Sequence, residues 1–324
     1  MKKRTKIILT VIAVLVVAYL LGPRPATPTY SATLPSLTQD LAKLENDVRT
    51  REASYALKPD VEARIIWADT NRTITDVAIV YLHGFSGTWH DGSPAIEEVA
   101  RRTGSNVYLA RLHGHGLRVA EPLADYSPDS VYADAVRALA IGKRLGRKVV
   151  VMGTSTGATL GLFLAARFPG DVSSVINWSP NIRLRHGLSF LANNPWGLSL
   201  ARLIVGGDYR ETKMKNPERA KYWYMKYRIE GIQQLQELLE TSMTPETFSA
   251  IRQPVLTMCW YHNDAVQDSI VSVDAMRTMH QQLSSQRKRF LPLNADAHEI
   301  GYAAESKAVA TVVEESVRWI GSNY

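Results

Sequence analysis

Short hydrophobic runs alternate with helical patterns along most of the chain from residue 62 to the C-terminus. Runs rich in Val, Ile and Leu predict buried strands, whereas apolar residues spaced three or four positions apart predict helices. The runs that predict strands are EARIIWAD, DVAIVYLHG, NVYLARLHGHG, KVVVMG, VSSVINWSP, QPVLTMCWYHND and KRFLPLN. The first alternates only weakly, so we expect it at an edge. The pattern predicts an α/β fold with a mostly parallel central sheet and helices on both faces.

Turn and capping residues delimit several of the predicted helices. Apolar residues at helical spacing predict a helix in LTQDLAKLENDVRTREASY. Ser93 and Pro94 mark the start of the helix SPAIEEVARRTG, and Gly104 marks its end. Gly146 closes the helix SPDSVYADAVRALAIGKRLG. The helices VDAMRTMHQQL and AAESKAVATVVEESVRWIGS flank the last strand.

One region, residues 181–252, interrupts this alternation after the fourth core strand. Three of its segments predict helices: NNPWGLSLARLIV, NPERAKYWYMKYRIEGIQQLQELLE and TPETFSAI. The second would begin at Asn216 and Pro217, and Trp223 and Tyr227 would then share one face. We favour packing of this aromatic face on the core below, and the alternative is that it lines an acyl pocket or touches a membrane surface. We therefore expect a helical lid over residues 181–252.

The most informative turn lies between the strand KVVVMG and the helix TGATLGLFLAARFPG. It contains a G-x-S-x-G pattern, Gly153 to Gly157, in the strand–turn–helix context that this motif requires. Both glycines are needed because the strand and helix backbones approach each other there. Ser155 would lie at the carboxyl end of the sheet, near the positive end of a helix. We interpret Ser155 as a candidate nucleophile rather than as part of an ordinary turn.

Three stretches make the chain resemble the α/β-hydrolase fold from about Asp76 to the C-terminus. VYLHGFSGT resembles the oxyanion loop after the third strand of that fold, ARLHGHGLR resembles the RGHG loop after the fourth, and MGTSTGA resembles the nucleophile elbow. The match is closest to the monoacylglycerol-lipase and serine-aminopeptidase-like carboxylesterases. The sequence differs from their pattern after Arg111, where Leu-His-Gly-His-Gly follows, and at the threonines that flank Ser155.

The resemblance implies that an acid and then a histidine follow the nucleophile in the chain. Asp264 and Asp268 both follow the strand after the insertion. We favour Asp264, because it lies three residues beyond Tyr261 and because NDAV resembles the family's D-x-V acid turn; Asp268 is the alternative. His298, in the loop after the last strand, is the candidate base.

The resemblance also implies an oxyanion hole made of two backbone N–H groups. One belongs to Thr156, the residue after the candidate nucleophile, and the other belongs to Phe85 in HGFSG. The alternative interpretation of HGFSG is an ordinary glycine turn.

Composition narrows the possible function classes. The formal net charge is +7, but residues 1–24 hold five basic residues and no acid, so the rest carries only 7 − 5 = +2. We therefore expect no nucleic-acid partner. Cys259 is the only cysteine, which excludes an internal disulfide, and its strand pattern predicts a buried, inert thiol. His113 and His115 lie in a Gly-rich loop without a further ligand nearby, so we expect no metal site. The sequence contains no nucleotide-binding motif, so we expect no cofactor.

The N-terminus has the pattern of a targeting segment. MKKRTK precedes fifteen uncharged residues, IILTVIAVLVVAYLL, which would span about 22 Å of a hydrocarbon core of about 30 Å. We expect a single-pass membrane protein, with residues 1–22 as an uncleaved signal anchor and the catalytic domain outside the cytoplasm. A cleaved signal peptide, leaving a secreted or periplasmic protein, is the alternative. Residues 23–36 would form a linker, and residues 37–180 and 253–324 the α/β core.

Together these features predict a serine hydrolase that cleaves carboxylic esters, of carboxylesterase or lipase-like type. Ser155, His298 and Asp264 would form the catalytic triad of an acyl-enzyme mechanism, acting on a small-molecule or lipid-like ester. A serine peptidase or an acyltransferase would use the same triad. A non-catalytic ligand-binding homologue would keep the fold but have a broken triad.

Overall fold

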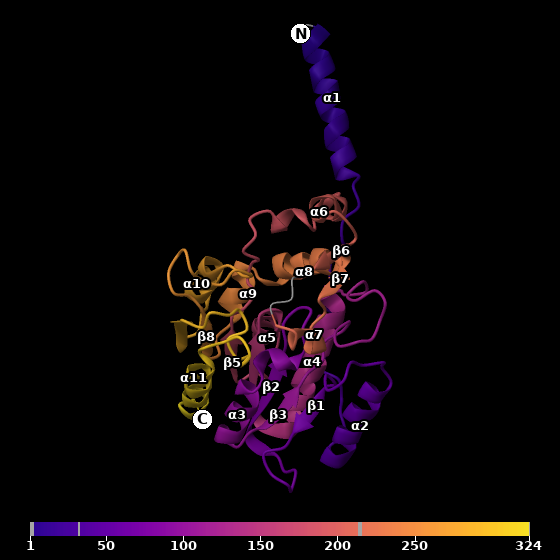
Figure 1. The fold of residues 1–324 in the computed structure, drawn as a ribbon. Coiled ribbons are helices and arrows are strands. Elements are labelled where there is room, and N and C mark those ends of the chain that lie inside the picture. The colour runs from indigo at the N-terminus through magenta and orange to yellow at the C-terminus, as the bar shows by residue number, and fades with distance from the viewer. Residues whose placement is uncertain (1–2, 32, 213–215, 324) are drawn as a thin grey trace.

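The structure is a computed structural model that describes residues 3–31, 33–212 and 216–323. Residues 1–2 of the expected signal anchor, residue 32 of the linker, residues 213–215 of the insertion and residue 324 of the core lie outside this description. A seven-stranded sheet forms the centre, in the order β1-β3-β2-β4-β5-β8-β9 (Figure 1). The strands are β1 (Arg64–Ile66), β2 (Thr75–Leu82), β3 (Asn106–Leu109), β4 (Gly146–Thr154), β5 (Ser174–Trp178), β8 (Val255–Trp260) and β9 (Lys288–Leu293).

Every strand pair in this sheet is parallel except β1 with β3. The weakly alternating run EARIIWAD forms the edge strand β1, as expected. Helices α3 (Ala95–Thr103), α4 (Pro128–Leu145), α5 (Thr156–Arg167), α10 (Val273–Gln282) and α11 (Val309–Gly321) connect or follow the strands, and α2 (Leu41–Ala53) precedes them. The predicted α/β fold with a mostly parallel sheet is confirmed.

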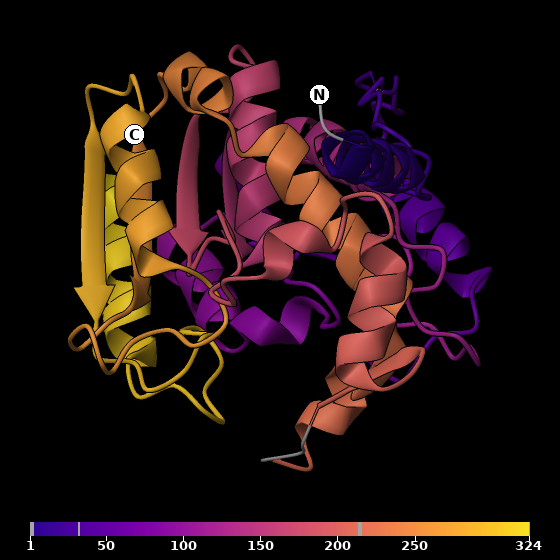
Figure 2. The same cartoon turned by 90° about the horizontal axis from the view of Figure 1, so that it is seen from above.

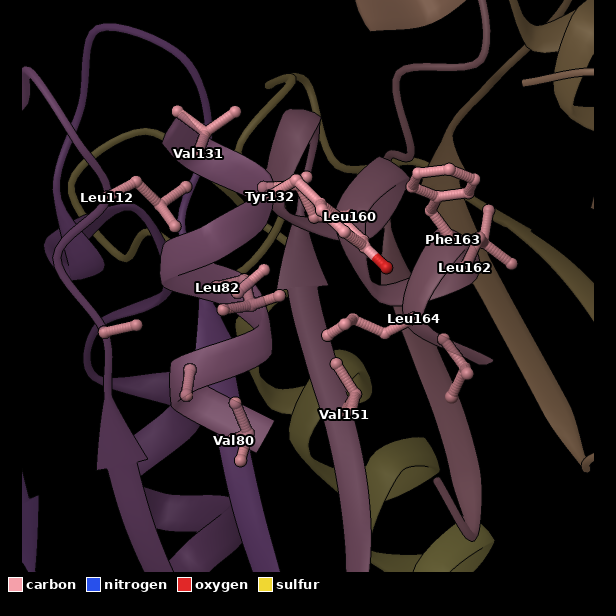
Figure 3. Packing of buried hydrophobic residues seen from close by; sticks show 14 of the residues in the cluster. Val80, Leu82, Leu112, Val131, Tyr132, Val151, Leu160, Leu162, Phe163 and Leu164 are labelled. Carbon is pink, nitrogen blue, oxygen red and sulfur yellow. The ribbon is translucent and has the colours of Figure 1, made fainter. Parts of the chain in front are cut away.

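The continuous hydrophobic runs are explained by burial of both faces of the sheet. Val80 and Leu82 of β2 pack with residues of α4 and α5, whereas Ile79 and Tyr81 of the same strand pack with residues of α3 and α11. Figure 3 shows part of the first of these layers, with side chains of β2 (Val80 and Leu82) and of α5 (Leu160 and Leu164). Because neighbouring residues of a strand point to opposite faces, a strand covered on both sides must be apolar at every position.

The insertion between β5 and β8 is helical only in part. It contains α6 (Gly197–Val205), β6 (Tyr209–Glu211), α7 (Arg219–Tyr222), β7 (Lys226–Arg228), α8 (Ile229–Ser242) and α9 (Pro245–Ala250), preceded by the 3₁₀ turn η2 (Ser189–Leu191). The single helix predicted from Asn216 is therefore wrong, because β7 pairs antiparallel with β6 and divides it. Figures 1 and 2 show α6 and α8 lying across one end of the sheet.

The aromatic residues of the insertion do not share a helical face. Trp223 follows α7 in an extended conformation, and Tyr227 lies in β7. Both side chains are nonetheless buried, as is Tyr224 between them. Aromatic residues fit strands well, so tertiary pairing outweighs the helical spacing here. The favoured interpretation, packing on the body of the protein, agrees with this burial.

The expected signal anchor corresponds to α1 (Lys3–Leu20), which projects away from the rest of the molecule (Figure 1). Three of its residues, Lys3, Arg4 and Lys6, are basic, which leaves an apolar part of about 21 Å from Ile7 to Leu20 at about 1.5 Å per residue. No helix in the described ranges is long and apolar enough to cross a membrane. The prediction of a single-pass membrane protein is therefore wrong.

Candidate active site

The candidate nucleophile lies on a strained turn between β4 and α5. Ser155 has φ 53° and ψ −117°, in the region of positive φ that side chains other than glycine rarely adopt. Its N–H donates to the Trp178 carbonyl at 2.9 Å, and its carbonyl accepts from Thr159 N–H at 3.1 Å. These bonds hold the strained residue at the carboxyl edge of the sheet.

The two flanking glycines have the steric role that the sequence predicted. A Cβ on Gly153 would lie 2.5 Å from the Gly157 carbonyl carbon, and a Cβ on Gly157 would lie 1.8 Å from the Leu82 carbonyl oxygen. No larger residue fits at either position. The close contact with Leu82 also sets the start of α5 directly against the end of β2.

The candidate base is paired with a buried carboxylate. His298 Nδ1 lies 2.6 Å from Asp268 Oδ2, and Asp268 is fully buried. The other carboxylate oxygen, Oδ1, accepts from the N–H groups of Ile270 and Val271 at 2.9 and 3.1 Å. Asp268 is thereby fixed with one oxygen directed at the imidazole. Burial lowers the pKa of His298, but the Asp268 carboxylate raises it more, so the net pKa is raised.

Asp264, the favoured acid in the sequence, does not contact His298. It is exposed, and its Oδ1 accepts from the Tyr261 hydroxyl at 2.7 Å. After β8 the chain forms a tight hairpin, in which Tyr261 bridges Gln267 and Asp268 N–H donates to the Trp260 carbonyl. Asp264 lies at the tip of this hairpin and Asp268 returns to the end of the strand. The structure therefore corrects the pairing to Asp268.

A turn signal in the sequence could have located this hairpin. The Asn263 side chain accepts from the N–H groups of Ala265 and Val266, and asparagine commonly makes such bonds in tight turns. A turn centred on Asn263 and Asp264 reverses the chain. The next acidic residue, Asp268, then becomes the one at the strand end.

The loop after β9, which carries His298, returns across the end of the sheet toward β5 and Ser93. A Cβ on Gly301 would lie 2.7 Å from the Trp178 ring, and Ala303 N–H donates to the Ser93 carbonyl. Ser155 and His298 are both buried, with exposed fractions of 7% and 8%. No hydrogen bond joins Ser155 Oγ to His298 Nε2 among the described residues, and such bonds often tighten only when substrate is bound.

The two amides expected to form the oxyanion hole lie on either side of Ser155. Thr156 begins α5, and Phe85 lies in the loop after β2, where a Cβ on Gly84 would lie 3.2 Å from Ser155 Cβ. Neither the Phe85 nor the Thr156 N–H has a hydrogen-bond acceptor in the part of the chain that the structure describes. Both donors remain available to a ligand.

The insertion covers this edge of the sheet and is bonded to both loops of the candidate site. Tyr224 N–H donates to the Ser86 carbonyl at 2.8 Å. Arg219 pairs with Glu299, the neighbour of His298, at 2.8 Å and with Glu305 at 2.9 Å. The insertion is therefore held against the loops that carry Phe85 and His298.

Cys259 is buried, and burial raises the pKa of its thiol to about 12, so it is not a nucleophile. Within residues 3–31, 33–212 and 216–323, no group of three or more His, Cys, Asp or Glu side chains could hold a metal ion.

A mostly parallel sheet, with a serine on a strained strand–turn–helix connection and a histidine after the last strand, is typical of the α/β-hydrolase class of protein. Residues 79–311 match the α/β hydrolase family, so the chain belongs to that family.

Relatives and solved structures give the same fold. A thermostable monoacylglycerol lipase from Bacillus sp. (strain H-257) is 26% identical over 228 residues, which cover 68% of this chain and 82% of that protein. The structure resembles a metagenome-derived lipolytic enzyme (TM-score 0.66, 18% identity, 82% of this chain and 99% of the other). It also resembles a soluble variant of the Saccharomyces cerevisiae monoglyceride lipase (TM-score 0.62, 13% identity, 92% of this chain and 99% of the other). A third similar structure is the Paleococcus ferrophilus monoacylglycerol lipase (TM-score 0.60, 16% identity, 82% of this chain and 100% of the other).

Proposed function

We propose that this chain is a serine hydrolase that cleaves carboxylic esters through an acyl-enzyme. Ser155 is the nucleophile, His298 the general base and Asp268 the acid that orients the base. The observation that carries this proposal is the buried pair at 2.6 Å between Asp268 and His298, on the same sheet edge as the strained Ser155.

Each group has a defined part in the reaction. Ser155 Oγ attacks the ester carbonyl as His298 Nε2 takes the hydroxyl proton. Asp268 accepts from His298 Nδ1–H and stabilises the imidazolium that forms. The N–H groups of Phe85 and Thr156 stabilise the oxyanion of the tetrahedral intermediate. His298 then protonates the leaving alkoxide, and a water molecule, activated by the same histidine, hydrolyses the acyl-enzyme.

A lipid-like ester is the proposed substrate class. The relatives described above include monoacylglycerol lipases and a lipolytic enzyme. An apolar cavity of about 330 Å³ lies in the insertion, lined mainly by residues of η2, α6 and α8 and by Ile270. This volume is within the range of small-molecule sites, and its apolar lining suits an acyl chain. Ile270 lines the cavity, and its N–H donates to Asp268 Oδ1, so one loop contributes to both the cavity and the candidate site.

A fluorophosphonate probe and a panel of p-nitrophenyl esters test the proposal together. We expect the probe to label the wild type and not Ser155→Ala, and we expect hydrolysis of medium-chain esters to be lost in the same variant. Absence of labelling in the wild type would overturn the serine-hydrolase mechanism. Labelling at Ser155 with a preference for acetyl esters would retain the mechanism and overturn the lipid-like substrate.

A further inference from the structure

The loop after β2 contains three consecutive backbone N–H groups, those of Gly84, Phe85 and Ser86. The first and the third are hydrogen-bonded to side chains. Gly84 N–H donates to Asp91 Oδ2 at 2.6 Å, and Ser86 N–H donates to His115 Nε2 at 3.1 Å. Phe85 N–H, between them, has no acceptor in the described chain. Two buried side chains thus fix the peptide units on either side of the one N–H that stays free.

The partners of His115 determine its tautomer. Nδ1 lies 2.8 Å from the His113 carbonyl, which can only accept, so Nδ1 carries the hydrogen. Nε2 faces the Ser86 N–H and must therefore present its lone pair. The ring is 1% exposed, and burial lowers the pKa of His115 well below its usual range. His115 is held as a neutral acceptor.

His83 makes the reciprocal connection between the same two loops. Its Nδ1 lies 2.8 Å from the Gly84 carbonyl, and its Nε2 accepts from Leu112 N–H at 3.0 Å. The His83 and His115 rings meet edge to face, with centroids 4.9 Å apart. Each histidine therefore binds the backbone of the loop that carries the other.

Asp91 connects the other side of the loop to the elbow. It is 1% exposed, and its Oδ1 accepts from the Tyr81 hydroxyl at 2.6 Å. Tyr81 also contacts Thr154 Oγ1 at 2.7 Å, in the residue before the nucleophile. The position of Gly84 is thereby linked to the end of β4.

We propose that His115 is a positioning residue of the oxyanion hole. By accepting from Ser86 N–H, it keeps Phe85 N–H directed at the reacting carbonyl. Asp91 fixes the other end of the same loop by accepting from Gly84 N–H. This inference rests on the proposed function, in which Phe85 N–H stabilises the oxyanion. That charge exists only in the transition state and the intermediate, so a displaced donor lowers kcat far more than it changes KM.

Two amide substitutions separate the roles of the two ring nitrogens. In His115→Gln, the longer side chain can place its amide oxygen where Nε2 lies and accept from Ser86 N–H, whereas the shorter amide in His115→Asn can replace only the Nδ1 donor. We expect His115→Asn to lower kcat about 10- to 100-fold with KM changed less than about threefold. We expect His115→Gln to recover most of that loss. His113→Asn, the same change two residues away on a half-exposed side chain, is the matched control and should keep wild-type kcat.

A second readout distinguishes positioning from a general loss of structure. An alkyl boronate forms a tetrahedral adduct that uses the oxyanion hole, so its inhibition constant should weaken in parallel with kcat/KM in His115→Asn. Inhibition by a fatty acid product should stay unchanged. If His115→Asn does not fold, Asp91→Ala and Asp91→Asn test the loop from its other side, with loss of kcat expected in the alanine variant alone.

The outcomes separate this inference from the function on which it rests. Wild-type kcat in His115→Asn, together with an inactive Ser155→Ala, would overturn the role of His115 and retain the serine hydrolase. An equal loss in the asparagine and glutamine variants would show that packing, not the acceptor, is what the loop requires. An unlabelled and inactive wild type would overturn the proposed function itself.

Discussion

The two sides of Ser155 are held by different kinds of interaction. On the base side, His298 contacts the Asp268 carboxylate, and the adjoining Glu299 pairs with Arg219 of the insertion. On the oxyanion side, the loop around Phe85 is held by neutral histidines and by a carboxyl whose pKa burial raises to about 8. The groups in direct contact therefore differ: an ion pair lies beside His298, whereas the Ser86 N–H is held by a neutral histidine.

This difference follows the charge that the proposed reaction would develop. On the base side a proton arrives and an imidazolium forms, which a nearby carboxylate stabilises. On the oxyanion side negative charge forms, and an ionised acceptor beside the loop would repel it. Neutral acceptors can position the loop without that penalty.

Removing the charge on the base side should have the largest effect. We expect Asp268→Asn to lower kcat about 10³- to 10⁴-fold, because the amide neither stabilises the imidazolium nor fixes its tautomer. Asp264→Asn, the matched control, should stay within about twofold of the wild type, since its carboxylate contacts Tyr261 at the exposed hairpin tip. Steady-state ester hydrolysis measures both. A large loss in Asp264→Asn with an active Asp268→Asn would reverse the assignment.

Breaking the ion pairs of Arg219 with Glu299 and Glu305 should lower the free energy of unfolding. Burial raises the pKa of Glu299, but His298 and Arg219 lower it more, so Glu299 stays ionised beside the base. Arg219→Gln leaves that buried charge without its partner and should reduce the free energy of unfolding by about 2 kcal/mol. Lys221→Gln, which breaks an exposed pair with Glu218 in the same segment, should change it by less than about 0.5 kcal/mol. Urea denaturation measures the free energy of unfolding of both variants. Equal losses in the two would contradict a special role for the Arg219 ion pairs.

A third effect should be a change in the pH dependence of stability at Asp91. Its pKa is raised from 3.8 to about 8, mainly by burial, so the folded state keeps a proton that the unfolded chain loses. Stability should therefore fall as pH rises from about 4 to about 8, by up to a few kcal/mol. Asp91→Asn mimics the protonated carboxyl and should flatten this slope. The slope is measured by urea denaturation at pH 5 and pH 8. An unchanged slope in the variant would mean that Asp91 is already ionised, and would weaken the contrast between the two sides.

The parts of the fold that could be predicted from the sequence are those determined by residues close together in the chain. The apolar runs identified the seven strands of the sheet, because burial on both faces requires apolar residues throughout. The small residues around Ser155 identified the elbow, because backbone contact excludes larger ones. Both signals lie within a few consecutive residues.

The failures come from contacts between distant segments. Asp264 is nearer to β8 along the chain, but the hairpin at Asn263 brings Asp268 back to the end of the strand. The helix from Asn216 is divided by the β6–β7 pairing. The contact of His115 with Ser86 cannot be predicted from the sequence, since no local pattern shows that the His115 acceptor faces another loop.

The contact at Gly157 has a consequence for how such a protein can diversify. Because the start of α5 meets the end of β2 with no room for a methyl group, backbone contact fixes how closely these two elements approach. The apolar cavity, by contrast, is lined mainly by side chains of the insertion between β5 and β8. Substitutions in that segment can change which molecules enter while the contact between α5 and β2 stays the same.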